Sequence, residues 1–281
     1  MRRSALLRRL LNLGMLPALL SLAGCAGGPV PGGTAGAGAT ATSGRFVERS
    51  VAIDGAPRRY QVFVPAAAAS GAPAQALPVV LFLHGSGERG SDGAAQTTAG
   101  LGPYVRAHAA DFPAIVVFPQ VPDGEEWSGP SRRTAFAALD AAMREFHGDP
   151  DRVYLTGISM GGYGVWELAL EAPSRFAALV PVCGAVKALS DERALYVTEV
   201  ANDPDPYRAI AGRLRDTPVW IFHGGRDDVV PPRDDRLLAA AFRAAGAKDA
   251  RYTELPDANH NSWDETYRTA AMWDWLFAQK R

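Results

Sequence analysis

Five short runs of consecutive apolar residues, separated by polar and Ala-rich stretches, constrain the fold of this chain more than any other feature. A strand that is buried on both faces has such a run, because helices cover both sides of a parallel sheet. The runs lie at residues 79–83, 114–118, 153–155, 177–182 and 219–222. They predict an α/β domain whose central sheet is mostly parallel.

Three further segments extend this predicted sheet. Residues 46–53 and 60–64 alternate polar and apolar side chains, as half-exposed antiparallel strands do, and residues 250–255 supply a last strand. Helical patterns occur at residues 133–146, 162–171, 234–245 and 265–279. We therefore expect a single domain over residues 45–281, with about eight strands and helices on both faces of the sheet.

Composition and charge exclude several classes of protein. The 281 residues include 29 Lys plus Arg and 30 Asp plus Glu, which leaves a formal net charge of -1 and argues against a nucleic-acid binder. Two cysteines are too few for a disulfide scaffold or a site of four thiolates around zinc. The five histidines show no paired ligand spacing, so we expect no metal and no cofactor. The oligomeric state is left open.

The N-terminus has the pattern of an export signal followed by a tether. Four arginines among the first nine residues precede a mostly apolar stretch at residues 10–22, which is short for a membrane span. The segment Leu22-Ala23-Gly24-Cys25 resembles a bacterial lipobox, which implies removal of residues 1–24 and lipidation of Cys25. Residues 26–44 are almost entirely Gly, Ala, Pro, Ser and Thr, a flexible linker.

These features predict an exported protein that is lipid-anchored to a bacterial membrane, on the periplasmic or the cell-surface side. The alternatives are an ordinary signal peptide or a buried first helix. The sequence does not decide between inner and outer membrane, or between the general and the twin-arginine export route.

A nucleophile motif follows one of the apolar runs. The residues Gly157-Ile158-Ser159-Met160-Gly161 form G-x-S-x-G between a predicted strand and a predicted helix. In that context the serine lies on a sharp turn, where its hydroxyl is exposed at the edge of the sheet. The pattern predicts Ser159 as a catalytic nucleophile, the alternative being a glycine-rich turn without chemistry.

A serine nucleophile needs a base and an acid that orients it, in the chain order Ser, acid, His for this motif. His260 alone lies after both Ser159 and an acid at a strand end, so it is the predicted base; the alternative is a histidine in a surface loop. Asp227, Asp228 and Asp257 are all candidates for the acid. We favour Asp227, because Asp257 is too close to His260 in sequence and adjacent residues of a turn point in different directions.

An oxyanion intermediate needs two backbone N–H donors. Met160, directly after the nucleophile, is the first. Ser86, in the glycine-rich segment at residues 84–90, is the predicted second, unless that segment is a plain turn. Trp127 is a candidate wall of the substrate site, or else it packs beneath its loop. His223 is expected to stabilise the loop that carries Asp227 by hydrogen bonding.

Five segments together resemble the α/β-hydrolase superfamily. More narrowly, they resemble bacterial prolyl-oligopeptidase-like esterases, which are close to dienelactone hydrolases and feruloyl esterases. The segments are LHGSGERG, PQVPDGEEW, GISMGGYG, HGGRDDVVP and DANHNSWDETY. The resemblance implies an α/β-hydrolase fold without a large cap domain, and a Ser159–Asp227–His260 triad. The chain departs from the pattern at Asn259, where Gly is commoner.

Three functions are consistent with these residues. The first is a serine carboxylesterase acting on small or aromatic acyl esters, free or carried by polysaccharides. The second is a peptidase of the same mechanism. The third, of another class, is a non-catalytic binding protein tethered to the surface. The stretch between Cys183 and Pro218 is polar and shows no amphipathic lid, which argues against a lipase.

Overall fold

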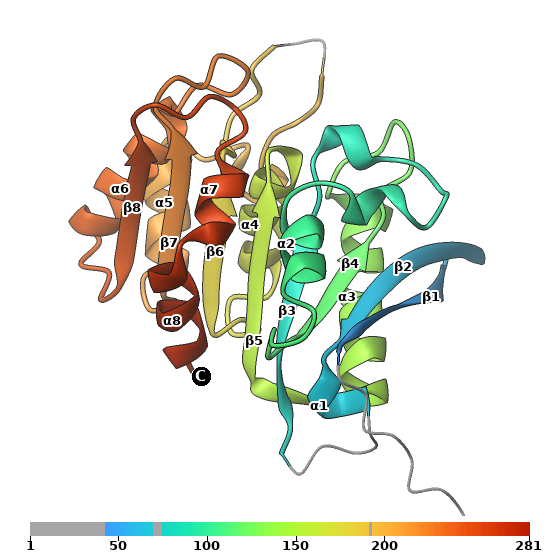
Figure 1. Ribbon diagram of the computed structural model, residues 1–281. Coiled ribbons are helices and arrows are strands. Elements are labelled where there is room, and N and C mark those ends of the chain that lie inside the picture. The colour runs from blue at the N-terminus through green and yellow to red at the C-terminus, as the bar shows by residue number, and fades with distance from the viewer. Residues whose placement is uncertain (1–42, 70–74, 191–192) are drawn as a thin grey trace, which may run out of the picture. The chain divides into compact units, whose positions relative to one another are not determined.

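The computed structural model describes residues 43–69, 75–190 and 193–281 (Figure 1). The predicted signal peptide, Cys25 and nearly all of the linker lie outside these residues. Within the described ranges, no helix is both long and apolar enough to cross a membrane.

An eight-stranded sheet organises the described part of the chain, in the order β1-β2-β4-β3-β5-β6-β7-β8. Strands β1 and β2 pair antiparallel with each other, and β2 pairs antiparallel with β4, whereas β3 to β8 run parallel. The bounds are β1 Arg45–Ile53, β2 Ala56–Val64, β3 Leu77–Leu83, β4 Ile115–Pro119, β5 Gly148–Ile158, β6 Ala178–Val182, β7 Val219–Gly224 and β8 Ala250–Leu255. The predicted α/β-hydrolase fold, with a mostly parallel sheet, is confirmed.

Helices cover both faces of this sheet (Figure 1). Residues of α3, α4, α5 and α6 contribute to one hydrophobic cluster, and residues of α2, α7 and α8 to the other. The bounds are α1 Ala66–Ala69, α2 Leu101–Ala107, α3 Gly129–Glu145, α4 Met160–Glu171, α5 Pro206–Arg213, α6 Arg233–Ala244, α7 Trp263–Arg268 and α8 Ala270–Ala278; short 3-10 helices are η1 Ser86–Glu88, η2 Ala95–Thr97 and η3 Thr198–Val200.

The structure corrects three expectations about helices. The single helix expected at 265–279 is two, because Thr269 adopts an extended backbone (φ −75, ψ 99) between α7 and α8. The helix α5 was not expected in a polar stretch; the side chain of Asp205 caps it by accepting from the backbone N–H of Arg208. The helix α2 was not expected either, and it buries only three residues of its seven.

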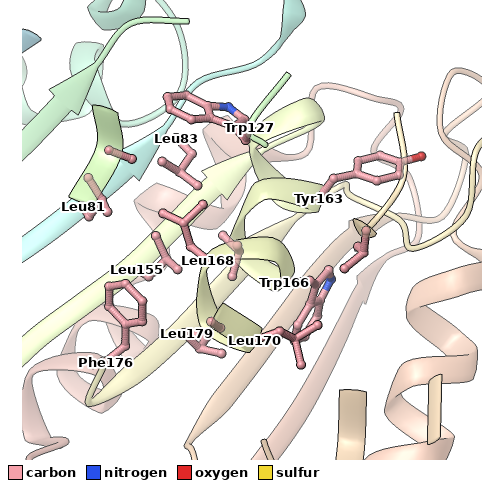
Figure 2. Packing of buried hydrophobic residues seen from close by; sticks show 14 of the residues in the cluster. Leu81, Leu83, Trp127, Leu155, Tyr163, Trp166, Leu168, Leu170, Phe176 and Leu179 are labelled. Atoms are coloured by element: carbon pink, nitrogen blue, oxygen red, sulfur yellow. The ribbon is translucent and has the colours of Figure 1, made fainter. Parts of the chain in front are cut away.

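Helix α4 lies at the centre of one face and is buried along almost its whole length. Figure 2 shows its side chains Trp166, Leu168 and Leu170 among leucines of β3, β5 and β6. A buried α-helix is mostly apolar all round, and α4 has no polar stripe; its buried Glu167 is paired with Arg132. This packing fixes the first turn of α4, and therefore the residue before it, relative to the strand ends.

The first turn of α4 approaches β3 too closely for a side chain. A Cβ at Gly161 would lie 1.9 Å from the carbonyl oxygen of Leu83, and backbone cannot yield as a flexible side chain can. We expect Gly161→Ala to lower the free energy of unfolding by about 3 kcal/mol or more, measured by urea denaturation.

Gly212 is the matched control, because it lies in α5 and a Cβ there meets nothing within 4 Å. Gly212→Ala should raise stability by about 0.5–1 kcal/mol through its higher helix propensity. Equal effects of the two substitutions would contradict the packing argument.

Candidate active site

The nucleophile lies in the turn between β5 and α4. Ser159 has φ 52 and ψ −116, a backbone conformation that a residue with a Cβ rarely adopts. Its N–H donates to the carbonyl of Val182 on β6 at 3.0 Å, and its own carbonyl accepts from Gly162 at 2.8 Å. These bonds on both sides hold the strained residue in place, with its side chain at the carboxyl end of the sheet.

The base comes from the loop between β8 and α7. His260 Nε2 lies 3.0 Å from Ser159 Oγ, so the hydroxyl can donate its proton to the ring. The ring of Trp263 packs edge-on against His260, with centroids 5.6 Å apart. The His260 side chain is 19% exposed, which leaves a route for substrate and water to reach it.

The acid comes from the loop after β7. Asp227 Oδ2 lies 2.7 Å from His260 Nδ1, so the ring N–H donates to the carboxylate and Nε2 is left to accept. The other oxygen, Oδ1, accepts from the N–H groups of Val229 and Val230 at 3.0 and 2.9 Å. Asp228, in contrast, is exposed, and Asp257 pairs with Arg226 on the surface. The structure therefore brings Asp227, and neither alternative, to His260.

Asp227 is buried but ionised. Burial alone would raise the pKa of this carboxyl, but hydrogen bonds from His223 and His260 and from the N–H of Val230 outweigh it and hold the pKa well below the usual range. A carboxylate that stays charged can fix the tautomer of His260 and stabilise the imidazolium that forms during catalysis.

The predicted oxyanion donors lie on the two sides of the nucleophile. Met160 is the first residue of α4, so its N–H has no acceptor within the helix. Gly85 faces the nucleophile, since a Cβ there would lie 3.6 Å from Ser159 Cβ, and Ser86 follows at the start of η1. The structure thus places the segment of Ser86 beside Ser159; its donor role remains a prediction.

Two buried side chains support this segment from behind. His84 donates from Nδ1 to the carbonyl of Gly85 at 2.7 Å and accepts at Nε2 from Val121 N–H at 3.0 Å, so the ring is neutral. Burial lowers the pKa of His84 to about 4, which agrees with that assignment. Trp127 Nε1 donates to the carbonyl of His84 at 3.0 Å, and the indole is 2% exposed.

Trp127 therefore packs against the oxyanion segment, which is a different contact from the packing beneath its own loop that was expected. It also lines a small cavity with Met160, Tyr163, Leu195 and other residues. Direct contact with substrate remains a prediction for this residue.

Two described stretches between β6 and η3, residues 184–190 and 193–197, lie beside the site, and we call them the strap. Charged side chains that no sequence motif marks hold them in place. Asp234 at the start of α6 accepts from the N–H groups of Val186 and Lys187 at 3.0 and 2.9 Å. Arg193 donates to Glu126 and, at 2.7 Å, to Ser86 Oγ. No motif marks these residues, because their partners lie 47 to 107 positions away in sequence.

A metal centre is not evident in the part of the chain that the structure describes, where no three His, Cys, Asp or Glu side chains are grouped to hold an ion.

The fold and this geometry together define an α/β-hydrolase with a Ser–His–Asp triad. The model of the prolyl oligopeptidase family matches residues 131–280, a little over half of the sequence and all three triad residues. The chain belongs to that family.

Three similar proteins are esterases by name. Esterase LipQ of Mycobacterium tuberculosis is 26% identical over 155 residues, covering 46% of this chain and 37% of LipQ. A thermostable esterase of known structure is 30% identical with a TM-score of 0.69, over 84% of this chain and 63% of its own. A ferulic acid esterase shares the fold at 17% identity with a TM-score of 0.62, over 84% and 97%. The chain spans 21% to 37% of the length of the curated relatives it matches.

Asp227 and its exposed neighbour Asp228 offer a matched test of the acid. Asp227→Asn should lower kcat toward an activated ester by about 10³–10⁴-fold, because the amide favours the wrong tautomer of His260. Asp228→Asn should change kcat less than about threefold, since that side chain is exposed. Steady-state kinetics on the two purified variants measure both effects; similar losses would refute the assignment of Asp227.

Proposed function

We propose that this protein hydrolyses carboxylic esters through an acyl-enzyme on Ser159. The observation that carries the proposal is the connected geometry of the triad, with 3.0 Å from Ser159 Oγ to His260 Nε2 and 2.7 Å from His260 Nδ1 to Asp227 Oδ2. The named similarity to esterases supports ester rather than amide substrates.

Acylation follows from these distances. His260 accepts the proton of the Ser159 hydroxyl while Oγ attacks the ester carbonyl, and Asp227 stabilises the imidazolium. The carbonyl oxygen becomes an oxyanion beside the N–H groups of Met160 and Ser86. His260 then gives its proton to the leaving alkoxide, so the alcohol departs and the acyl group remains on Ser159.

Deacylation repeats the sequence with water. A water molecule takes the place of the alcohol, and His260 removes its proton as the oxygen attacks the acyl carbon. Collapse of the second oxyanion breaks the bond to Ser159, and His260 returns the proton to Oγ. The products are a carboxylic acid and the free enzyme.

We propose that the substrates are esters of small or aromatic acyl groups, including such esters carried by polysaccharides. A cavity of about 340 Å³ lies under the strap, lined by Val186, Tyr196, Val197 and Val200 with Lys187 at its side. The smaller cavity lined by Met160 and Trp127 also includes Tyr196, so the two adjoin. Lys187 and Asp203 interrupt the apolar walls of the larger cavity, whose size suits a compact acyl group.

Peptide hydrolysis is the second candidate, because the family that the chain belongs to is named for a peptidase activity. The same triad can cleave an amide, although the poorer leaving group demands protonation by His260 as it departs.

The test is hydrolysis of p-nitrophenyl acetate, methyl ferulate and an aminoacyl p-nitroanilide by the full chain. We expect both esters to be cleaved faster than the anilide, and Ser159→Ala to lower kcat by about 10⁴-fold or more. Ser50→Ala, on the exposed edge of β1, is the matched control and should retain activity.

The outcomes separate the candidate functions. Preferential cleavage of the anilide would favour the peptidase. No turnover, together with no labelling of Ser159 by a fluorophosphonate, would refute both hydrolase functions and favour a tethered binding protein.

We also propose that the protein is exported and anchored to a bacterial membrane through a lipid on Cys25. The lipobox-like sequence at residues 22–25 and the glycine- and alanine-rich stretch after it support this location. The proposal of polysaccharide-linked substrates depends on this export, since an exported enzyme can contact polysaccharides outside the cytoplasm.

The anchor can be tested with the chain's two cysteines. Cells that express the protein and are fed radiolabelled palmitate should label the wild type and Cys183→Ala, because Cys183 is buried in the fold. Cys25→Ser should lose the label and leave the membrane fraction. Equal labelling of wild type and Cys25→Ser would contradict the proposal.

A further inference from the structure

The hydrogen-bonded chain of the active site does not end at Asp227. Behind it lies His223, whose Nε2 is 3.2 Å from Asp227 Oδ2 and 2.8 Å from the carbonyl oxygen of Val230. The other nitrogen, Nδ1, is 2.7 Å from Oδ2 of Asp235 on α6. The side chains of His223, Asp227 and Asp235 are completely buried.

Both ring nitrogens of His223 face only acceptors. A neutral imidazole has one nitrogen that donates and one that accepts, as His84 shows by accepting from Val121 N–H. If His223 were neutral, one nitrogen lone pair would point at a carboxylate or carbonyl oxygen. Only the imidazolium form, with an N–H on each nitrogen, satisfies this environment while both aspartates are ionised.

The charges of the cluster favour the same protonation state: burial raises the pKa of Asp235, whereas the hydrogen bond and the charge of His223 lower it and stabilise the carboxylate. Asp235 Oδ1 has no hydrogen-bond partner among the described residues, so His223 is the group that compensates this buried carboxylate. A charge without compensation in the interior is strongly unfavourable. With His223 protonated, one cation lies between two carboxylates, and the triad's His260 contacts the same oxygen of Asp227, Oδ2, as His223 does.

We propose that His223 is a permanently protonated positioning residue, held in that state by Asp235, which keeps Asp227 ionised and limits its attraction for the imidazolium form of His260. The base then remains neutral, and able to accept a proton from Ser159, down to a lower pH than a simple Asp–His pair would allow. The consequence for catalysis rests on the proposed esterase function, whereas the protonation state does not.

The pKa of His223 agrees with the geometry. Burial lowers it, but the hydrogen bonds to Asp227 and Asp235 and the charge of Asp235 outweigh burial and raise the pKa to about 10. Other titratable groups face the cluster from the elements around it. They are Asp234 on α6, Tyr252 and Glu254 on β8, Tyr163 on α4, Cys183 after β6 and His260.

The protonation state is tested by nuclear magnetic resonance on the full chain labelled with ¹⁵N-histidine, with His223→Gln used to assign the signals. We expect both nitrogens of His223 to carry protons from pH 5 to pH 9. A single protonated nitrogen anywhere in that range, including a neutral ring paired with a protonated Asp235, would overturn the proposal.

The effect on the base is tested by substitution. In His223→Gln, which keeps an N–H donor but no charge, the titration midpoint of the His260 ring signals should move to higher pH by about half a unit or more. The acid limb of kcat/KM for p-nitrophenyl acetate should move with it. In Asp235→Asn, His223 should lose its proton at a lower pH. In that background, adding His223→Gln should move the titration midpoint of His260 by less than it does in the wild-type background.

Tyr207→Phe is the matched control, because it removes a buried hydrogen bond from an uncharged donor, the Tyr207 hydroxyl, to Asp234 at the same end of α6. It should lower the thermal midpoint without moving the titration of His260. If His223→Gln behaves in the same way, its role is structural and the proposal fails. If no ester is cleaved by the wild type, the esterase function fails, and the two ring titrations still decide the proposal.

Discussion

The close contact between the first turn of α4 and the end of β3 is the constraint on which the site depends. Gly161 lies where any Cβ would collide with the carbonyl of Leu83, and at Gly162 a Cβ would lie 2.7 Å from the Cα of Gly184. Because the helix can approach so closely, the residue before it must reverse direction in one step. Ser159 therefore takes a positive φ, and its neighbours lack side chains on the sides where the chain segments meet.

A second constraint is electrostatic and concerns how many charges the fold can bury at one strand end. Asp227, Asp235 and Asp234 are all buried, and each has a distinct set of donors. Asp234 accepts hydrogen bonds from the N–H groups of the strap and the hydroxyl of Tyr207, whereas Asp227 and Asp235 share His223. The donors to Asp234, together with the cation that Asp227 and Asp235 share, allow three carboxylates to lie near one another without any of them being left unpaired.

The sequence predicted the sheet and the triad residues because each depends on local signals. Apolar runs mark buried strands, and the G-x-S-x-G pattern states which residue lies at the turn. The choice of Asp227 over Asp228 was also local, since adjacent residues in a turn point apart. The break at Thr269 was not predictable, because a helical pattern continues through it and only the tertiary packing of α7 and α8 separates the two helices.

The roles of Asp235 and Arg193 could not be predicted from the sequence for a different reason. In the sequence, Asp235 is one of several acidic residues at the start of a helix. Such residues ordinarily lie in solvent and interact with the helix dipole. Only the three-dimensional fold shows that the first turn of α6 is buried against the end of β7, which places the carboxylate on His223. The local sequence thus specifies the atoms that react, whereas long-range packing of charged residues specifies how those atoms are held and protonated.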